Sequence, residues 1–430
     1  MDTPDSNVSP PNSAIPPPQS QTTTPNEPAE DTTEKTLDET STAEEDPIRK
    51  RLKDETLRRT NKEITPRGWQ LDVAMALIEG KDAVVVAGTG EGKTLAFTLP
   101  LFNRTQYQKN RIMLVISPLN MLEADQRESF KKLGLKAVVI NHETYHDGME
   151  EIQAGGCDII LTSPEMCLTS ERFRTFLSDP KFGAQIMMIV VDEAHCIVNW
   201  GKSFRKTYRE LGNLRALIPN PVPVLATSAT LTPDDITIVR DVMLIDAAKS
   251  YFINLGNDRP NISYEVAIMP STTTDYSALY ELLVDRSTGE ERLRRTIIFL
   301  DDREEAMAAC RQIREDCPPH LKELCDFLHA MRGEGTKIRV FRDFKTGKIY
   351  VLVATEAAGM GCDIRDIELV IQWGVCSDLA TWLQRAGRAG RDPTIKARAI
   401  MFVPASTFHE RAPAEGGKES TKDQRKAKEL

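Results

Sequence analysis

The stretch VVVAGTGEGKTLAF, from Val84 to Phe97, passes from an apolar run through a glycine-rich turn into a helical pattern. An apolar run of this kind is typical of a strand that is buried on both faces of a sheet. Glycine tolerates the backbone angles of a tight turn and lets backbone N–H groups approach a ligand closely. The stretch therefore predicts a strand, a phosphate-binding loop and the first turn of a helix.

The same alternation of apolar runs and helical patterns continues along most of the chain. The first set of runs is DAVVVAG, IMLVISP, KAVVINH, CDIILTSP, IMMIVVDEAH and VPVLATSAT. After NDRPN at 257–261 a second set follows: ISYEVAIM, TIIFLDD, KIYVLVAT, LVIQWGV and ARAIMFV. Buried strands separated by helices form parallel sheets, whose functional residues gather at the carboxyl ends of the strands. The sequence predicts an α/β fold with two tandem domains, at 55–260 and 261–408.

Both ends of the chain have the composition of disordered tails, at 1–54 and 409–430, with few large apolar residues. Residues 1–48 hold eleven acids and one base, a charge of −10, whereas the whole chain carries −9. The remainder is therefore close to neutral, and net charge does not exclude a nucleic-acid partner. The basic cluster RKRLK at 49–53 fits either a solvated helix start or a nuclear import signal. We expect a nuclear or otherwise cytoplasmic protein.

The cysteines and the apolar runs exclude several classes of protein. The eight cysteines include no C-x-x-C pair, so we expect reduced thiols and no zinc site. No apolar run approaches the roughly 20 residues that span a bilayer. The polar, acidic N-terminus does not resemble a secretory signal.

The glycine-rich turn has the composition of a loop that binds nucleoside triphosphates. In AGTGEGKT, Ala87 replaces the first glycine of the usual G-x-x-x-x-G-K-[ST] pattern. We expect Lys93 to reach the β- and γ-phosphates of ATP and the Thr94 hydroxyl to bind Mg²⁺. The alternative is a chance turn, which the flanking strand and helix disfavour. The other residues expected to line the nucleotide are Gly88, Thr89, Gly90, Glu91 and Gly92.

Two further motifs carry charges suited to the same chemistry. Asp192 and Glu193 end a buried apolar run, where carboxylates are costly unless they meet a cation. We expect Asp192 to hold Mg²⁺ and Glu193 to orient or deprotonate the attacking water. The alternative is an acidic strand end that caps the following helix.

The second domain contains WLQRAGRAGRD, with Gln384, Arg385, Arg388 and Arg391 at helical spacings that predict most of them on one helix face. Arginines brought to the γ-phosphate from another domain stabilise the charge of the transition state. We therefore assign catalytic roles to Gln384, Arg388 and Arg391. The alternative, an arginine-rich solvated surface, would be favoured if the two phosphate motifs were absent.

Together these motifs resemble superfamily 2 helicases over residues 60–404. AGTGEGKT, DEAH, TSAT, VATEAAGMGCDI and QRAGRAGRD occur in that family's order. DEAHCIVNWGKSFRKTYRELGNLR, NDRPNISYEV and RGWQ are similar to the RecQ branch of the family. The resemblance implies two RecA-like domains, ATP with Mg²⁺, and 3′-to-5′ movement on single-stranded or forked DNA, with RNA less favoured as the partner.

The resemblance also implies roles for individual residues. Gln70, with Arg67 nearby, would read adenine, and Asp363 would approach the ribose. His195, Ser228 and Thr230 would couple hydrolysis to domain movement. Trp200, Phe204 and Arg205 would sense single-stranded DNA, although core packing is the alternative for the aromatic pair. The expected backbone contacts are Ser117, Pro118, Thr162, Ser163, Thr355 and Gly359.

The chain departs from the RecQ pattern in three places. Arg385 stands where RecQ proteins usually carry an acid, FLHAMRGEG loses an expected glycine, and no cysteine follows Cys376. RecQ proteins usually continue into a zinc-binding, duplex-splitting region, so weak unwinding is expected. Three alternatives remain: a DEAD-box-type RNA helicase, a truncated DNA-binding ATPase or clamp with little unwinding activity, and a protein-remodelling ATPase.

Overall fold

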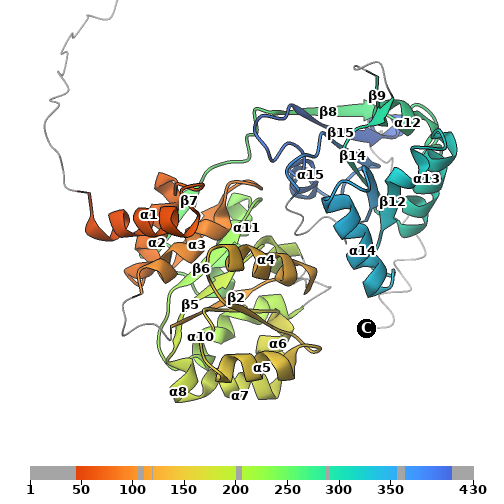
Figure 1. Ribbon diagram of the computed structural model, residues 1–430. Helices are drawn as coiled ribbons and strands as arrows, with labels where there is room; N and C mark the ends of the chain where they lie inside the picture. Colours follow the sequence, from red (N-terminus) through yellow and green to blue (C-terminus); the bar gives the residue numbers. More distant parts are fainter. Residues whose placement is uncertain are drawn as a thin grey trace, which may run out of the picture. The chain divides into compact units, whose positions relative to one another are not determined.

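The computed structural model describes residues 45–104, 111–118, 120–199, 206–286, 291–355 and 364–408 (Figure 1). These residues form a seven-stranded sheet, a six-stranded sheet and one small two-stranded ribbon. All strand pairs in the two large sheets are parallel. The α/β class and the tandem RecA-like architecture predicted from the sequence are thus confirmed.

The first sheet has the strand order β3-β4-β2-β5-β6-β1-β7. Each of its first six strands coincides with an apolar run that the sequence predicts. The seventh, β7, lies at the edge and alternates half-buried with exposed residues, so its run is not continuously apolar. The strand bounds are β1 Ala83–Val86, β2 Ile112–Ile116, β3 Ala137–Ile140, β4 Ile159–Thr162, β5 Ile186–Val191, β6 Val224–Ser228 and β7 Tyr251–Asn254.

Successive residues of each strand face opposite sides of this sheet, and helices cover both sides. Val85 belongs to one apolar core, whereas Val84 and Val86 belong to the other. The core that contains Val85 is covered by α1 Pro47–Arg59, α2 Gly68–Ile78, α3 Lys93–Phe102 and α4 Asn120–Lys132. The other is covered by α5 Tyr145–Gln153, α6 Pro164–Thr169, α7 Glu171–Ser178, α8 Pro180–Gly183, α9 His195–Asn199, η2 Lys206–Asn213, α10 Leu214–Leu217 and α11 Pro233–Met243.

The second sheet has the strand order β12-β13-β11-β14-β15-β8. Its strands are β8 Ile262–Ile268, β11 Thr296–Phe299, β12 Cys325–Leu328, β13 Val351–Ala354, β14 Leu369–Trp373 and β15 Ala397–Val403. One core is covered by α12 Ser277–Leu283 and α13 Arg303–Asp316, the other by α14 Glu334–Lys345 and α15 Leu379–Ala386. The ribbon pairs β9 Val284–Asp285 with β10 Arg292–Leu293, and the 3-10 helices of this part are η3 Lys322–Leu324 and η5 Ala405–Phe408.

Helix α1 begins inside the stretch 1–54 that composition assigns to the N-terminal tail, and it contains the RKRLK cluster. The Asp46 carboxylate accepts the backbone N–H of Ile48 at 2.7 Å, and Pro47 occupies the first helical position. Leu52 is fully buried in the core under β1. None of the helices in the described residues combines the length and the apolar character that crossing a bilayer requires.

Candidate nucleotide-binding site

Three of the predicted motifs follow three neighbouring strands of the first sheet. The loop 87–92 follows β1, the acids Asp192 and Glu193 follow β5, and Thr230 lies just beyond the end of β6. Strand β6 pairs with both β1 and β5, so the three loops meet at one edge of the sheet. This is the carboxyl edge, where parallel sheets carry their ligands.

The phosphate loop has the backbone that its glycines allow. Gly90 and Gly92 have φ angles of +87° and +82°, in the left-handed region. Nζ of Lys93 donates to the carbonyl oxygens of Ala87 at 2.7 Å and Gly88 at 3.1 Å, so its charge lies inside the loop. Burial lowers the pKa of Lys93, although the negative charges of Glu193 and Asp192 oppose that shift. The lysine is thus positioned to meet anionic phosphates, and Thr94 follows it in the first turn of α3.

The residues predicted to read adenine lie against this loop. Gln70 is 3% exposed, and its Nε2 donates to the Gly92 carbonyl at 2.9 Å. Its Oε1 accepts the backbone N–H of Arg67 at 2.8 Å, and the Arg67 guanidinium pairs with Glu91. Base recognition by Gln70 and Arg67 stays a prediction, and their contacts place both residues at the phosphate loop.

The two acids at the end of β5 differ in their surroundings. Asp192 is 9% exposed and accepts hydrogen bonds from Gln126 Nε2 at 2.8 Å and from the Glu193 N–H at 3.0 Å. Burial, followed by the charge of Glu193, raises the pKa of Asp192 to about 6. A bound cation would favour the ionised form of Asp192. A buried carboxyl group that two hydrogen-bond donors hold in place therefore fits the predicted Mg²⁺ ligand. Gln126 was not foreseen, because only the fold brings α4 to this strand end.

Glu193 is the more acidic member of the pair. Burial would raise its pKa, but the nearby basic groups His195, Lys93, Arg388 and Arg391 together hold it below the ordinary value. Its backbone φ is +53°, a conformation that is rare outside glycine. An ionised carboxylate in a fixed, uncommon backbone geometry fits the predicted role of orienting an attacking water.

His195 connects three of the predicted motifs. Its Nδ1 lies 3.1 Å from the Ser228 hydroxyl and 3.3 Å from Glu193 Oε2. Its Nε2 lies 3.4 Å from Nε2 of Gln384, in the second sheet's domain. Ser228 in turn accepts the backbone N–H of Thr230 at 3.2 Å. The predicted coupling residues are thus in direct contact, and Gln384 joins them.

The arginines of QRAGRAGRD do not share one helix face, which corrects the spacing argument. Helix α15 ends at Ala386, and Gly387 and Gly390 form a turn that carries Arg388. Gly387 is the C-cap of the helix, and the chain then turns through Gly390, whose φ of +51° lies in the left-handed region, so Arg388 and Arg391 lie beyond the helix. Arg385, still helical, turns into its own domain and donates to Asp301 at 2.7 Å and Gln372 at 2.5 Å.

The turn after α15 contacts the phosphate loop. The Thr89 hydroxyl donates to the Gly387 carbonyl at 3.0 Å, and a Cβ built on Gly90 would lie 3.8 Å from Arg391 Cγ. Arg388 is 2% exposed and, like Arg391, acts on the charges of Glu193 and Lys93. The structure therefore brings the two predicted arginine fingers to the lysine and the glutamate.

Two residues of the NDRPN segment also belong to this site, although the sequence pattern assigned that segment only to the domain junction. Arg259 Nη1 donates to the Thr89 carbonyl at 2.8 Å, and its Nη2 donates to the Gly390 carbonyl. Asn261 Nδ2 donates to the Gly390 carbonyl at 2.7 Å and to the Ile395 carbonyl at 3.0 Å. The junction therefore holds the phosphate loop and the arginine turn together.

The predicted nucleic-acid contacts are only partly described. Trp200, Phe204, Arg205 and Gly359 lie outside the described residues, as does Asp363, which was predicted to approach the ribose of the nucleotide. Those that are described lie at the carboxyl ends of β2, β4 and β13, where Thr162 donates to the Ile140 carbonyl at 2.8 Å and Ser163 caps α6. The roles of Ser117, Pro118, Thr162, Ser163 and Thr355 toward nucleic acid stay predictions.

Across the described segments, no group of three or more His, Cys, Asp or Glu side chains is arranged to hold a metal ion. Two tandem RecA-like domains, a phosphate loop with its lysine, an acidic pair and arginines from the second domain define the class as a P-loop nucleotide-binding protein. The family model described as DEAD/DEAH box helicase matches residues 67–239, and the helicase conserved C-terminal domain matches 275–393. The chain belongs to the DEAD/DEAH-box helicases of superfamily 2.

Individual relatives agree with this family. ATP-dependent DNA helicase Q1 of Pongo abelii is 29% identical over 342 residues, covering 78% of this chain and 50% of the relative. ATP-dependent DNA helicase RecQ of Haemophilus influenzae is 28% identical over 347 residues, covering 80% of this chain and 52% of the relative. The chain spans about half the length of these curated relatives. The solved DEAD-box helicase Mss116, bound to ssRNA and UDP-BeF, has a similar fold, with a TM-score of 0.67, 18% identity, and coverage of 88% of this chain and 80% of that one.

Proposed function

We propose that this protein is an ATP-dependent DNA helicase or translocase of RecQ type that moves 3′ to 5′ on single-stranded DNA. The observation that carries the proposal is the contact series from Glu193 through His195 to Gln384. It links the hydrolytic carboxylate of the first domain to the arginine-bearing element of the second. A change at the γ-phosphate can therefore alter the contact between the domains, which is what a nucleic-acid motor requires.

The chemistry follows from the charges around the phosphate loop. Lys93 would neutralise the β- and γ-phosphates, and Glu193, ionised at neutral pH, would accept a proton from the attacking water. Thr94 and Asp192 would hold Mg²⁺, which supplies charge neutralisation on the phosphate oxygens. Arg388 and Arg391 would stabilise the charge that develops on the transferred phosphoryl group.

DNA is favoured over RNA because the two curated relatives described above are named DNA helicases. The RNA alternative is suggested partly by Arg385, because an arginine where RecQ proteins usually carry an acid is more typical of DEAD-box proteins. Arg385 is 5% exposed and is engaged with Asp301 and Gln372 of its own domain. These contacts give Arg385 a structural role within the second domain. Its presence therefore does not favour RNA over DNA as the bound strand.

The test compares ATP hydrolysis by the full chain with single-stranded DNA, with single-stranded RNA of the same sequence, and with neither. We expect stimulation by DNA that exceeds stimulation by RNA, and unwinding of a short duplex with a 3′ tail but not of one with a 5′ tail. Lys93→Ala is the inactive control, and Lys131→Ala, an exposed lysine on α4, is the matched control. Greater stimulation by RNA would establish the alternative, and hydrolysis indifferent to both polymers would overturn the proposal.

A further inference from the structure

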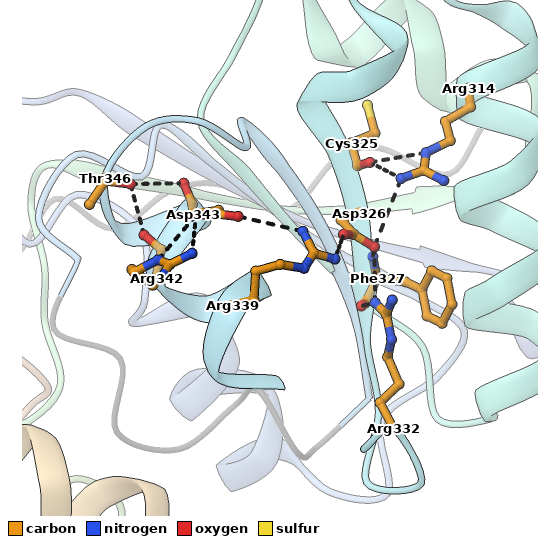
Figure 2. Close-up of polar contacts among 9 residues, drawn as sticks. All are labelled: Arg314, Cys325, Asp326, Phe327, Arg332, Arg339, Arg342, Asp343 and Thr346. Carbon is orange, nitrogen blue, oxygen red and sulfur yellow. Dashed lines mark hydrogen bonds and ion pairs between the residues drawn. The ribbon is translucent and has the colours of Figure 1, made fainter. Parts of the chain in front are cut away.

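A row of arginines lies along the open edge of the second sheet, outside the nucleotide site. Strand β12 is the edge strand, since it pairs only with β13. Arg314 comes from α13, Arg332 from the loop after β12, and Arg339 and Arg342 from α14. Figure 2 shows three of these guanidinium groups pointing toward Asp326 on β12, with Arg342 beside Asp343.

One buried carboxylate is shared among three of these arginines. Asp326 is 7% exposed, and its oxygens lie 2.9 Å from Arg332 Nη1, 3.2 Å from Arg339 Nη2 and 3.8 Å from Arg314 Nη2. Asp343 contacts Arg339 at 3.5 Å and Arg342 at 3.3 Å. Two carboxylates thus face four guanidinium groups, which leaves an excess of positive charge. Residues 331–348 hold six bases and two acids, whereas the chain beyond the acidic N-terminal segment is close to neutral.

Covering the sheet edge accounts for only part of this cluster. Arg314 donates to the Cys325 carbonyl at 2.6 Å, and Arg332 donates to the Phe327 carbonyl and lies 4.1 Å above the Phe327 ring. These contacts satisfy carbonyls that an edge strand would leave open. The guanidinium groups of Arg339 and Arg342 contact the carboxylates of Asp326 and Asp343, and their side chains are 47% and 63% exposed. Unlike Arg314 and Arg332, the exposed guanidinium groups of Arg339 and Arg342 do not cover the carbonyls of the edge strand.

A buried polar atom lies at the end of the same strand. His329 directly follows β12, is 8% exposed and stacks on the Phe327 ring with centroids 5.6 Å apart. Its Nδ1 has no hydrogen-bond partner among the described residues. Burial, followed by the charges of Arg332, Arg303 and Lys337, lowers the pKa of His329. A neutral imidazole beside several cations is suited to donate a hydrogen bond to an anionic oxygen.

We propose that the surface formed by His329, Arg332, Arg339 and Arg342 binds the phosphodiester backbone of a nucleic acid. It lies one strand further out than Thr355, which follows β13 and was predicted as a backbone contact. Guanidinium groups held by shared carboxylates present fixed donors to phosphate oxygens. This inference rests on the proposed function for its partner, and it extends the expected contact surface to the edge of the second sheet.

The test measures binding of a fluorescent single strand and of a blunt duplex over a range of salt concentrations, without nucleotide. Arg339→Ala/Arg342→Ala should reduce the slope of log affinity against log salt by about 0.7 per lost contact on single strands or about 0.9 on a duplex. The polymer whose slope falls identifies the source of the phosphates. Arg339→Lys/Arg342→Lys, which keeps both charges, should retain most of the slope.

The matched control is Arg286→Ala/Arg398→Ala, two arginines of the same domain that are 48% and 52% exposed and also paired with acids. In this control the slope of log affinity against log salt should equal that of the unmodified chain. The basal ATPase rate of both double variants should also equal that of the unmodified chain. An unchanged slope in Arg339→Ala/Arg342→Ala would overturn the inference while leaving the proposed function intact. Failure of the unmodified chain to bind either polymer would instead remove the proposed function. Equal loss in the control and test variants would show a general charge effect and would also overturn the inference.

Discussion

The adjacent carboxyl groups of Asp192 and Glu193 have pKa values that their surroundings shift in opposite directions. Burial and the neighbouring charge raise the pKa of Asp192 to about 6, whereas four nearby basic groups hold the pKa of Glu193 below its ordinary value. Two carboxyl groups with separated pKa values can take different tasks at one pH. Asp192 needs a cation to remain ionised at low cost, and Glu193 is already ionised and able to accept a proton.

The raised pKa of Asp192 predicts how the stability of the Mg²⁺-free protein depends on pH. Because the pKa is higher in the folded state, protonation of Asp192 stabilises the folded protein. This contribution to the free energy of unfolding is fully present below pH 3.8 and is lost as the pH rises through about 6. Once Asp192 is ionised, the folded protein should be destabilised by about 3 kcal/mol, at about 1.4 kcal/mol for each pKa unit. Relative to a variant that cannot ionise at this position, the unmodified protein without Mg²⁺ should lose about 1.4 kcal/mol of its free energy of unfolding between pH 5 and pH 7, because about one pH unit of that interval lies below the pKa of about 6. Thermal unfolding at the two pH values measures this loss.

Asp192→Asn provides the comparison for this prediction. The amide does not ionise, so the variant should lose most of the difference between pH 5 and pH 7. The lowered pKa of Glu193 affects stability only below its ordinary value of 4.5, outside this interval. A difference that is the same size in the variant as in the unmodified protein would contradict the assignment to Asp192.

Arg385 and Arg388 are three positions apart, but replacing each by alanine should change a different property: stability for Arg385 and ATP turnover for Arg388. Arg385→Ala leaves the buried Gln372 oxygen without its guanidinium partner, which should cost about 1–3 kcal/mol of stability. Arg388→Ala should lower ATP turnover by about 10³-fold, the scale for an arginine finger, and weaken ATP binding much less. Urea unfolding and single-turnover hydrolysis separate the two effects. Loss of ATP binding as large as the loss of turnover would make Arg388 a ground-state contact.

At the scale of elements, the short turn after α15 decides where the arginines lie. Gly387 follows the last helical residue, and its carbonyl accepts the Thr89 hydroxyl of the phosphate loop. A Cβ on Gly387 would lie 2.4 Å from Thr89 Oγ1 and 3.0 Å from the Leu383 carbonyl, so a side chain there forces the turn and the loop apart.

Gly387→Ala should therefore lower ATP turnover without unfolding the second domain. The expected result is a loss of at least tenfold in turnover, because small displacements of catalytic groups are costly. The far-ultraviolet circular dichroism spectrum should be unchanged. Gly333→Ala is the matched control, since a Cβ there would meet nothing within 4 Å. Normal turnover in Gly387→Ala would show that the turn does not need this close approach.

Two strands of the large sheets were not predicted from the sequence, and neither is a continuous apolar run. The buried strands β1, β2, β5 and β6 form continuous apolar runs and were identified directly. The edge strands β7 and β12 were not, because one alternates in exposure and the other carries Asp326 within a short run. The last two arginines of QRAGRAGRD lie beyond helix α15, because helical spacing alone does not show where a helix ends.

At the scale of the whole molecule, the candidate site draws residues from motifs separated by about 300 positions, and sequence order alone identified most of them. Lys93, Asp192, Glu193 and Arg388 were predicted because their chemistry is visible in the motifs themselves. Gln126 and Arg259 were missed, because an amide on a helix and an arginine in a connecting segment have no distinctive pattern. Their roles arise only when folding brings separate segments to the same atoms.

Coupling between the domains should depend on Gln384, whose Nε2 lies 3.4 Å from His195 in the other domain. Gln384→Ala removes that contact and leaves the phosphate loop, the acids and the arginines in place. We expect ATP binding within about threefold of normal, and a ratio of DNA-stimulated to basal hydrolysis reduced by about tenfold, equivalent to about 1.4 kcal/mol. The measurement is the ratio of stimulated to basal hydrolysis, with Gln312→Ala on the exposed face of α13 as the matched control. If basal and stimulated rates fall together, Gln384 acts in hydrolysis itself and the His195 contact does not transmit the state of the nucleotide.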